Sequence, residues 1–256
     1  MSRRFALSLL AAIPLAVSVG HAGAAELNVV GAGAIEEPFE QLSADFGRES
    51  GHKVHAIFGP VGGMQAKLKG GEKADVIVLS AAAMDALDKD GSLVAGSRAD
   101  LAKTGVGVVV KAGTSLPDIG SVDAFKRTLL AAKSVAYSDS ASGVYVSTEM
   151  FAKLGIADAM KDKARKIPAT PVGEIVAHGD AEIGFQQISE LMPVKGIDIV
   201  GQLPAEVQKI TIFSAGVSTT SKEPDAAKSL ITFLASAQAA PVLIKAGLEP
   251  IQGGKS

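Results

Sequence analysis

Three short loops rich in small residues are the parts of this sequence best suited to hold a ligand. They span residues 31–34, 59–63 and 138–143, and each lies between a predicted strand and a predicted helix. The first turn of a helix has N–H groups without intrahelical partners and carries the positive end of the helix dipole. Small side chains let a ligand approach that backbone. Such loops can bind an anion, although a single one is often only a tight turn.

The third loop adds side-chain donors to these backbone groups. Ser138, Ser140 and Ser142 place three hydroxyls within five residues. A hydroxyl can donate to an oxyanion and accept a bond elsewhere. Serines at this place also cap helices, so Ser140 or Ser142 could have that role alone. Gly143 closes the loop, and Tyr145 lies where its hydroxyl could reach the same ligand.

The other candidate ligand-binding residues lie at further strand ends and helix starts. Gly33, Ala34, Gly62 and Gly63 come from the first two loops, Ser80 ends an apolar strand, and Val172 starts a predicted helix.

Two glutamines end a predicted strand in the apolar segment IGFQQIS. Because side chains alternate along a strand, we expect only Gln187 to face the ligand and Gln186 to face solvent or a neighbouring helix. A buried amide needs a hydrogen-bond partner, which is either the ligand or nearby backbone.

Signatures of enzymes and metal sites are incomplete. Residues 31–33 begin a G-x-G pattern, but Glu36 replaces the third glycine of a dinucleotide fingerprint, and the common phosphate-loop and serine-nucleophile motifs do not occur.

His52 and His55 would point to opposite faces of one strand, which disfavours a metal ion shared between them. Glu36 and Glu37 are favourable at a helix start, and one of them could contact a ligand hydroxyl. We therefore expect no catalysis, no cofactor and no metal.

Composition excludes several further classes of function. The chain has 256 residues, no Cys, no Trp and a formal net charge of −2. It has no thiolate ligands for a metal, no broad basic face for nucleic acid, and few aromatic rings for stacking. We expect a monomer whose apolar core alone holds it together.

The elements that must position these residues alternate between strand and helix. This order indicates an α/β fold with parallel strands. Segments 105–111 and 209–217 are predicted to cross between two lobes, and Gly107 and the region of Lys209 are candidate hinges. The first lobe would hold residues 26–108 and 213–256, and the second residues 109–212.

The N-terminus has the pattern of a secretory signal peptide. Arg3 and Arg4 precede an apolar run over residues 5–19 and small residues at 22–25. The run is shorter than the roughly 20 residues of a spanning helix. We assign residues 1–25 to the signal peptide, with cleavage after Ala24 or Ala25, and expect a periplasmic protein.

At its loops the sequence resembles the molybdate-binding proteins of bacterial ABC importers. The order and spacing of several segments carry the resemblance over nearly the whole mature chain, and none of them is specific alone. These segments are residues 29–39, 70–76, 138–145, 153–155, the strand at Gly184, 210–217, 233–234 and Pro241. The resemblance implies a two-lobed type II periplasmic-binding fold that closes on its ligand, docks on a membrane permease and catalyses no reaction.

The departures from that family fall in its ligand pocket. The family usually places serines at positions that match Ala34 and Gly62, often alanine at the position of Ser142, and tyrosine at that of Gln187. A hydrogen bond to a charged group contributes about 1.5–3 kcal/mol, so two lost hydroxyls weaken oxyanion binding.

The predicted ligand is therefore a small anion, either molybdate or tungstate or an organic di- or tricarboxylate. An adhesion or sensor module on the same fold, and a serine hydrolase using Ser140 or Ser142, are the alternatives.

Overall fold

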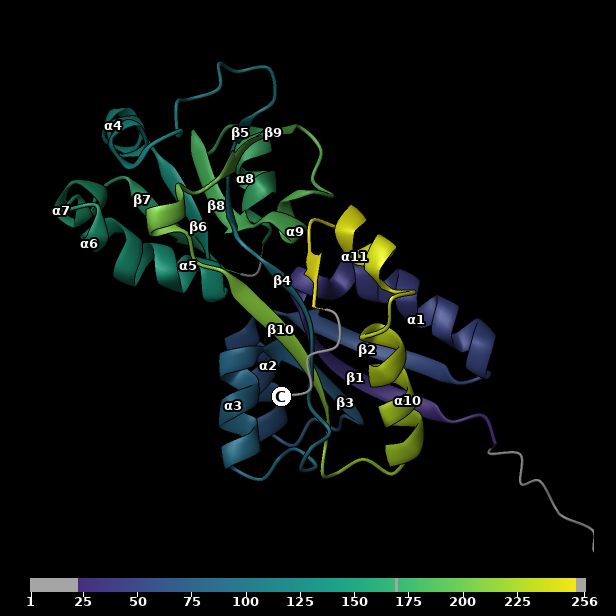
Figure 1. The fold of residues 1–256 in the computed structure, drawn as a ribbon. Helices are drawn as coiled ribbons and strands as arrows, with labels where there is room; N and C mark the ends of the chain where they lie inside the picture. The colour runs from purple at the N-terminus through teal and green to yellow at the C-terminus, as the bar shows by residue number, and fades with distance from the viewer. Residues whose placement is uncertain (1–22, 169, 252–256) are drawn as a thin grey trace, which may run out of the picture.

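The computed structural model describes residues 23–168 and 170–251, which form two lobes, each built on its own β-sheet (Figure 1). The predicted signal peptide lies almost entirely outside the described residues. Within the described part of the chain, none of the helices is both long and apolar enough to cross a membrane.

The first lobe contains a six-stranded sheet in the order β11-β4-β10-β3-β1-β2. Its strands are β1 (Glu26–Ala32), β2 (Lys53–Gly59), β3 (Val76–Ser80), β4 (Ala99–Thr104), β10 (Thr211–Val217) and β11 (Glu249–Pro250). Its helices are η1 (Gly33–Ile35), α1 (Glu36–Ser50), α2 (Val61–Lys69), α3 (Ala81–Lys89), α10 (Pro224–Leu234) and α11 (Ala240–Lys245).

The second lobe contains a five-stranded sheet in the order β7-β6-β8-β5-β9. Its strands are β5 (Val106–Lys111), β6 (Val135–Ser138), β7 (Ala164–Ile167), β8 (Ile183–Gln187) and β9 (Ile197–Gln202). Its helices are α4 (Val122–Ala131), α5 (Ala141–Tyr145), the π-helical turn Val146–Met150, α6 (Phe151–Lys153), α7 (Ala157–Met160), α8 (Val172–His178), α9 (Ile188–Leu191) and η3 (Ala205–Val207).

Both sheets are mixed, so the predicted parallel pairing holds for some of their strands and not for others. Strands β1, β2 and β3 are parallel to one another, as are β6, β7 and β8, whereas β10 is antiparallel to β3 and β5 is antiparallel to β8. The reversed strands β5 and β10 each follow a crossing between the lobes. Gly105 alone separates β4 from β5, and the chain returns to the first sheet between residues 202 and 211. We propose that the lobes follow the sheets, with boundaries at these two places.

Each lobe has its own apolar core. In the first, Phe39, Val78 and Phe213 are buried on the six-stranded sheet. In the second, apolar clusters cover both faces of the sheet, and Val108 and Val109 of β5 belong to different clusters. This follows from the alternation of side chains along a strand.

Gly107, one of the predicted hinges, lies inside β5 and pairs with Gln186 on one side and Gln202 on the other. A Cβ at this position would lie 2.4 Å from Ile188 Cδ1. The glycine therefore makes room for the start of α9 against the sheet.

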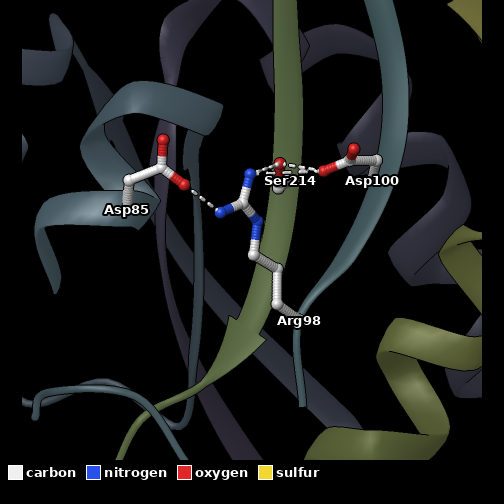
Figure 2. Close-up of polar contacts among 4 residues, drawn as sticks. All are labelled: Asp85, Arg98, Asp100 and Ser214. Atoms are coloured by element: carbon white, nitrogen blue, oxygen red, sulfur yellow. Dashed lines mark hydrogen bonds and ion pairs between the residues drawn. The ribbon is translucent and has the colours of Figure 1, made fainter. Parts of the chain in front are cut away.

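A polar cluster ties α3 to strands β4 and β10 (Figure 2). The Arg98 guanidinium is ion-paired with Asp85, and its Nη2 lies 3.5 Å from Asp100 Oδ1 and 3.4 Å from Ser214 Oγ. Ser214 in turn donates to Asp100 at 2.5 Å. The cluster lies where the pairing of β10 with β4 shifts register, between Phe213 and Ser214.

Candidate functional site

Strands from both sheets end around one small space between the lobes. The carboxyl ends of β1 and β2 approach it from the first lobe and those of β6 and β8 from the second, which is where α/β proteins usually bind ligands. The space itself is small, with a volume of about 10 Å³. It is lined by Ala32, Gly33, Ala34, Gly59, Pro60, Val61 and Phe213 of the first lobe and by Ser140, Ala141, Gln187 and Glu190 of the second. All three predicted loops therefore contribute to one site.

The second loop is shorter than predicted. Helix α2 begins at Val61, so Gly62 and Gly63 lie in its first turn and not in a loop. Pro60 and Val61 border the space, whereas the two glycines do not. Pro60 has no side chain that can cap the helix, so the first N–H groups of α2 are left for other acceptors.

The serines of the third loop bind one another. Ser138 Oγ lies 2.7 Å from Ser140 Oγ and 3.1 Å from Ser142 Oγ, and the latter two are 3.1 Å apart. Ser140 precedes α5 without capping it. Ser142 is fully buried, whereas Ser140 borders the interlobe space. Ser140 is therefore the hydroxyl of this group that a ligand can reach.

Gly143 and Tyr145 have structural roles in the second lobe. A Cβ on Gly143 would lie 1.6 Å from the Ser138 carbonyl oxygen, so only glycine allows α5 to pack this close to β6. The Tyr145 ring is buried in the core, and its hydroxyl donates to the Val207 carbonyl oxygen at 2.7 Å. The expectation that this hydroxyl points into the site is therefore wrong.

Ser80 and Val172 also lie away from the space. Ser80 is buried at the junction of β3 and α3 and is not among the lining residues. Val172 is buried at the start of α8, and its N–H already donates to Gln186 Oε1 at 2.8 Å.

The two glutamines at the end of β8 are both buried, and of the two surroundings predicted for Gln186 the neighbouring helix is the one found, since its Oε1 accepts a hydrogen bond from the Val172 N–H at the start of α8. Gln187 borders the space, and its Nε2 donates across the lobes to Thr211 Oγ1 at 2.9 Å. Its Oε1 has no hydrogen-bond partner within the described residues. Since a rotated amide could accept a bond from Thr211, Gln187 can offer a ligand either a donor or an acceptor.

Glu190, in the short helix α9, was not among the predicted site residues. The residue is partly buried as a whole, but its Oε2 atom is shielded from solvent and has no partner in the described part of the chain. The opposite lobe approaches closely, because Glu190 Oε1 lies 3.4 Å from the position that a Cβ on Gly33 would take. A carboxyl oxygen that is shielded from solvent and has no partner is costly and points to a function.

The surroundings of Glu190 favour its protonated form. Burial raises the pKa of Glu190 to about 7, although hydrogen bonds from the Gln186 side chain and the Gln187 backbone oppose this change. The negative charges of Asp139 and Glu36 raise the pKa further. A carboxyl group in this range can both donate and accept a proton near neutral pH.

A signal for Glu190 was present in the sequence. It is a charged residue in an apolar stretch. It also lies three positions after Gln187, so the two side chains lie on the same face of the chain if a helix starts where the strand ends.

A wider groove of about 740 Å³ leads away from the site past Gly33 and Glu190. Its charged residues are mostly acidic: Glu36, Glu37, Glu40, Glu174 and Glu190, with His178 and Lys195. Within residues 23–168 and 170–251, no three acidic or histidine side chains are arranged to hold a metal ion.

Comparison with known proteins gives consistent matches over nearly the whole chain. Residues 27–249 match the sequence profile of the bacterial extracellular solute-binding protein family. An aconitate isomerase from a Pseudomonas species is 40% identical over 230 residues, or 88% of each chain. The molybdate-binding protein ModA of Azotobacter vinelandii is 29% identical over 234 residues, covering 87% of this chain and 89% of that one.

Solved structures share the fold. The periplasmic molybdate-binding protein of Azotobacter vinelandii matches with a TM-score of 0.73 at 21% identity, covering 89% of this chain and 100% of that one. PEB3 with bound L-phospholactate matches with a TM-score of 0.67 at 15% identity, covering 87% of this chain and 99% of that one.

Proposed function

The chain belongs to the bacterial extracellular solute-binding protein family, and on this premise we propose that it captures a small organic polycarboxylate between its lobes. The protein would be exported to the periplasm and would deliver the ligand to the membrane permease of an ABC importer. Each lobe supplies part of the site, so a bound ligand favours the closed arrangement by contacting both.

The observation that carries the choice of ligand is the carboxyl group of Glu190 in the site. When protonated, it can donate a hydrogen bond to a ligand carboxylate. When ionised, it repels any anion, so a bound anion favours the protonated form of Glu190. Ala34 supplies no hydroxyl where the molybdate-binding family usually has one, which further disfavours a tetrahedral oxyanion.

The relatives support an organic anion. Aconitate, the substrate named for the isomerase, is a tricarboxylate, and L-phospholactate combines a carboxylate with a phosphate. In this chain Ser140, Gln187 and Glu190 offer polar groups from one lobe, and the first turn of α2 offers backbone N–H groups from the other.

Titration calorimetry of the mature protein tests this proposal. We expect tricarboxylates such as citrate and cis- or trans-aconitate to bind more tightly than succinate, and molybdate and sulfate to bind weakly. Ser140→Ala should lower affinity about tenfold, as expected for one hydrogen bond to a charged group. Ser115→Ala, an exposed serine outside the site, is the matched control. Tight molybdate binding without carboxylate binding would contradict the proposal.

Isomerisation of the bound ligand is a second candidate function, favoured by Glu190 and by the aconitate isomerase relative. It would replace our expectation that the protein is not an enzyme. Incubation with cis-aconitate, followed by proton NMR, would reveal trans-aconitate if the protein has this activity. Its complete absence would leave the binding function alone.

A further inference from the structure

Resting on the polycarboxylate site and its isomerase candidate, we propose that Glu190 is the acid–base group of this site. It would take a proton from the carbon on one side of the ligand's double-bond system and return it to the carbon on the other side.

The first argument is that Glu190 is the one ionisable side chain among the described residues that line the interlobe space. The others are small, apolar, a hydroxyl or an amide. Proton transfer at carbon needs a base in contact with the ligand, so no other lining side chain is suited to it.

The second argument is the unmet bonding capacity around the carboxyl group. Glu190 Oε2 and Gln187 Oε1 are both shielded from solvent and lack hydrogen-bond partners within the described chain. Gln187 is 1% exposed and borders the same space. Two unpartnered polar atoms at one buried place indicate that a ligand completes their bonding.

The third argument is that Glu190 is held in place. The Gln186 side chain lies beside it and lowers its pKa against the effect of burial, and the same side chain is fixed by the Val172 N–H, 2.8 Å from Gln186 Oε1. Gln186 is thus a positioning residue for the carboxyl group. Gly33 of the opposite lobe lies across the space, so closure brings a ligand against Glu190.

The step that follows conserves all atoms. In cis-aconitate, the ionised Glu190 removes a proton from the methylene carbon next to the double bond. The electron pair of that C–H bond forms a new double bond to the central carbon. The electrons of the former double bond then take the proton from Glu190 at the far carbon. The product is aconitate with its double bond moved, in cis or trans geometry, and Glu190 is ionised again.

The charges around Glu190 set the expected pH dependence. Asp139 follows β6, Glu36, Glu37 and Glu40 lie on α1, Glu174 and His178 on α8, and Lys195 follows α9. Because this setting is mainly acidic, an anionic ligand binds best when Glu190 is protonated. Proton removal needs the ionised form. Affinity should therefore fall, and the rate of turnover rise, as the pH increases through about 7.

The test compares wild type with Glu190→Gln, Glu190→Asp and, as a control for loss of one charge, Glu206→Gln, which is exposed and outside the site. Binding of cis-aconitate is measured by calorimetry and isomerisation by proton NMR. We expect Glu190→Gln to bind within a few-fold of wild type but to lose at least about 100-fold in turnover. Glu190→Asp should keep some activity with an altered pH profile, and Glu206→Gln should match wild type.

A second measurement tests the positioning role. Gln186→Leu removes a hydrogen bond that favours the ionised carboxyl, so it should move the inflection of the pH–rate profile upward. A general loss of structure would lower the rate without this shift.

The outcomes separate the two proposals. Wild type that binds tricarboxylates without isomerising them, or Glu190→Gln with full turnover, would overturn the role of Glu190 and leave the binding function standing. Failure of wild type to bind any carboxylate would overturn the proposed function, and this inference with it.

Discussion

At the residue scale, Glu190 couples folding to pH. Burial raises the pKa of Glu190 from 4.5 to about 7, so the folded chain binds this proton more tightly than the unfolded chain. The stabilisation is complete below about pH 4.5 and is lost as the pH rises to about 7. Wild type should thus lose about 2 kcal/mol more than Glu190→Gln in its free energy of unfolding between pH 5 and pH 8.

Urea unfolding at the two pH values measures this difference, with Glu206→Gln as the control for a lost negative charge. Equal pH dependence in wild type and Glu190→Gln would show that the carboxyl group is not desolvated in the folded protein.

Gly143 is the residue at which the backbone of the site tolerates least change. A Cβ there would overlap the Ser138 carbonyl oxygen, and backbone cannot move aside as a side chain can. Gly143→Ala should cost about 3 kcal/mol or more of folding free energy and displace Ser140. Gly63→Ala provides the matched control, because that position in α2 is open and alanine favours helix by about 0.5–1 kcal/mol. Thermal unfolding of both variants would check the contrast.

A site residue could be predicted when neighbouring residues in the chain indicate its role, and could not when contacts with distant residues decide it. Small residues at a strand end, such as Ala34 and Ser140, are visible in the sequence and border the site. Tyr145 was misplaced because its partner, the Val207 carbonyl, is 62 residues away in the chain. Glu190 was missed because its importance depends on contact between lobes, which no local pattern encodes.

At the scale of elements, continuous apolar strands were easy to predict and polar ones were not. The sequence of β3 is apolar up to its last residue, Ser80, because both faces of the strand are buried. β4, with the sequence ADLAKT, and β7, with ARKI, mix charged and apolar residues and were missed. Their neighbours in the sheet make them strands: β4 pairs with β10, more than 100 residues later in the chain, and β7 with β6.

The polar cluster that joins α3, β4 and β10 predicts how those elements depend on one another. Asp100 contacts both Arg98 and Ser214 in a partly buried setting, so Asp100→Asn should cost about 1–3 kcal/mol by weakening bonds at a shielded charge. Asp85 is 59% exposed, and Asp85→Asn should cost less than about 1 kcal/mol. Urea unfolding would rank the two variants. Equal losses would mean that the outer ion pair contributes as much as the inner one.

At the scale of the whole molecule, the chain passes from β4 of the first sheet into β5 of the second and later returns to β10 of the first (Figure 1), and the site lies between the two sheets. Gln187 reaches from β8 to Thr211 on β10, and an added Cβ on Gly247 would lie 2.8 Å from Ile188 Cγ2, so α9 packs against the first lobe. The proposed ligand would add contacts to both lobes and so favour the closed arrangement.

Ligand binding should therefore make the protein both more compact and more stable. A tricarboxylate at 100 times its dissociation constant adds about 2.7 kcal/mol to the free energy of unfolding, which corresponds to roughly 5–10 °C in Tm for a chain of this size. Small-angle scattering of the same samples should show a smaller radius of gyration. Thr211→Val, which removes the hydroxyl partner of Gln187 at the lobe junction, should enlarge the unliganded protein relative to wild type. A rise in Tm with an unchanged radius would mean that the ligand binds without closing the lobes, and the proposed delivery of a closed complex to a permease would then be wrong.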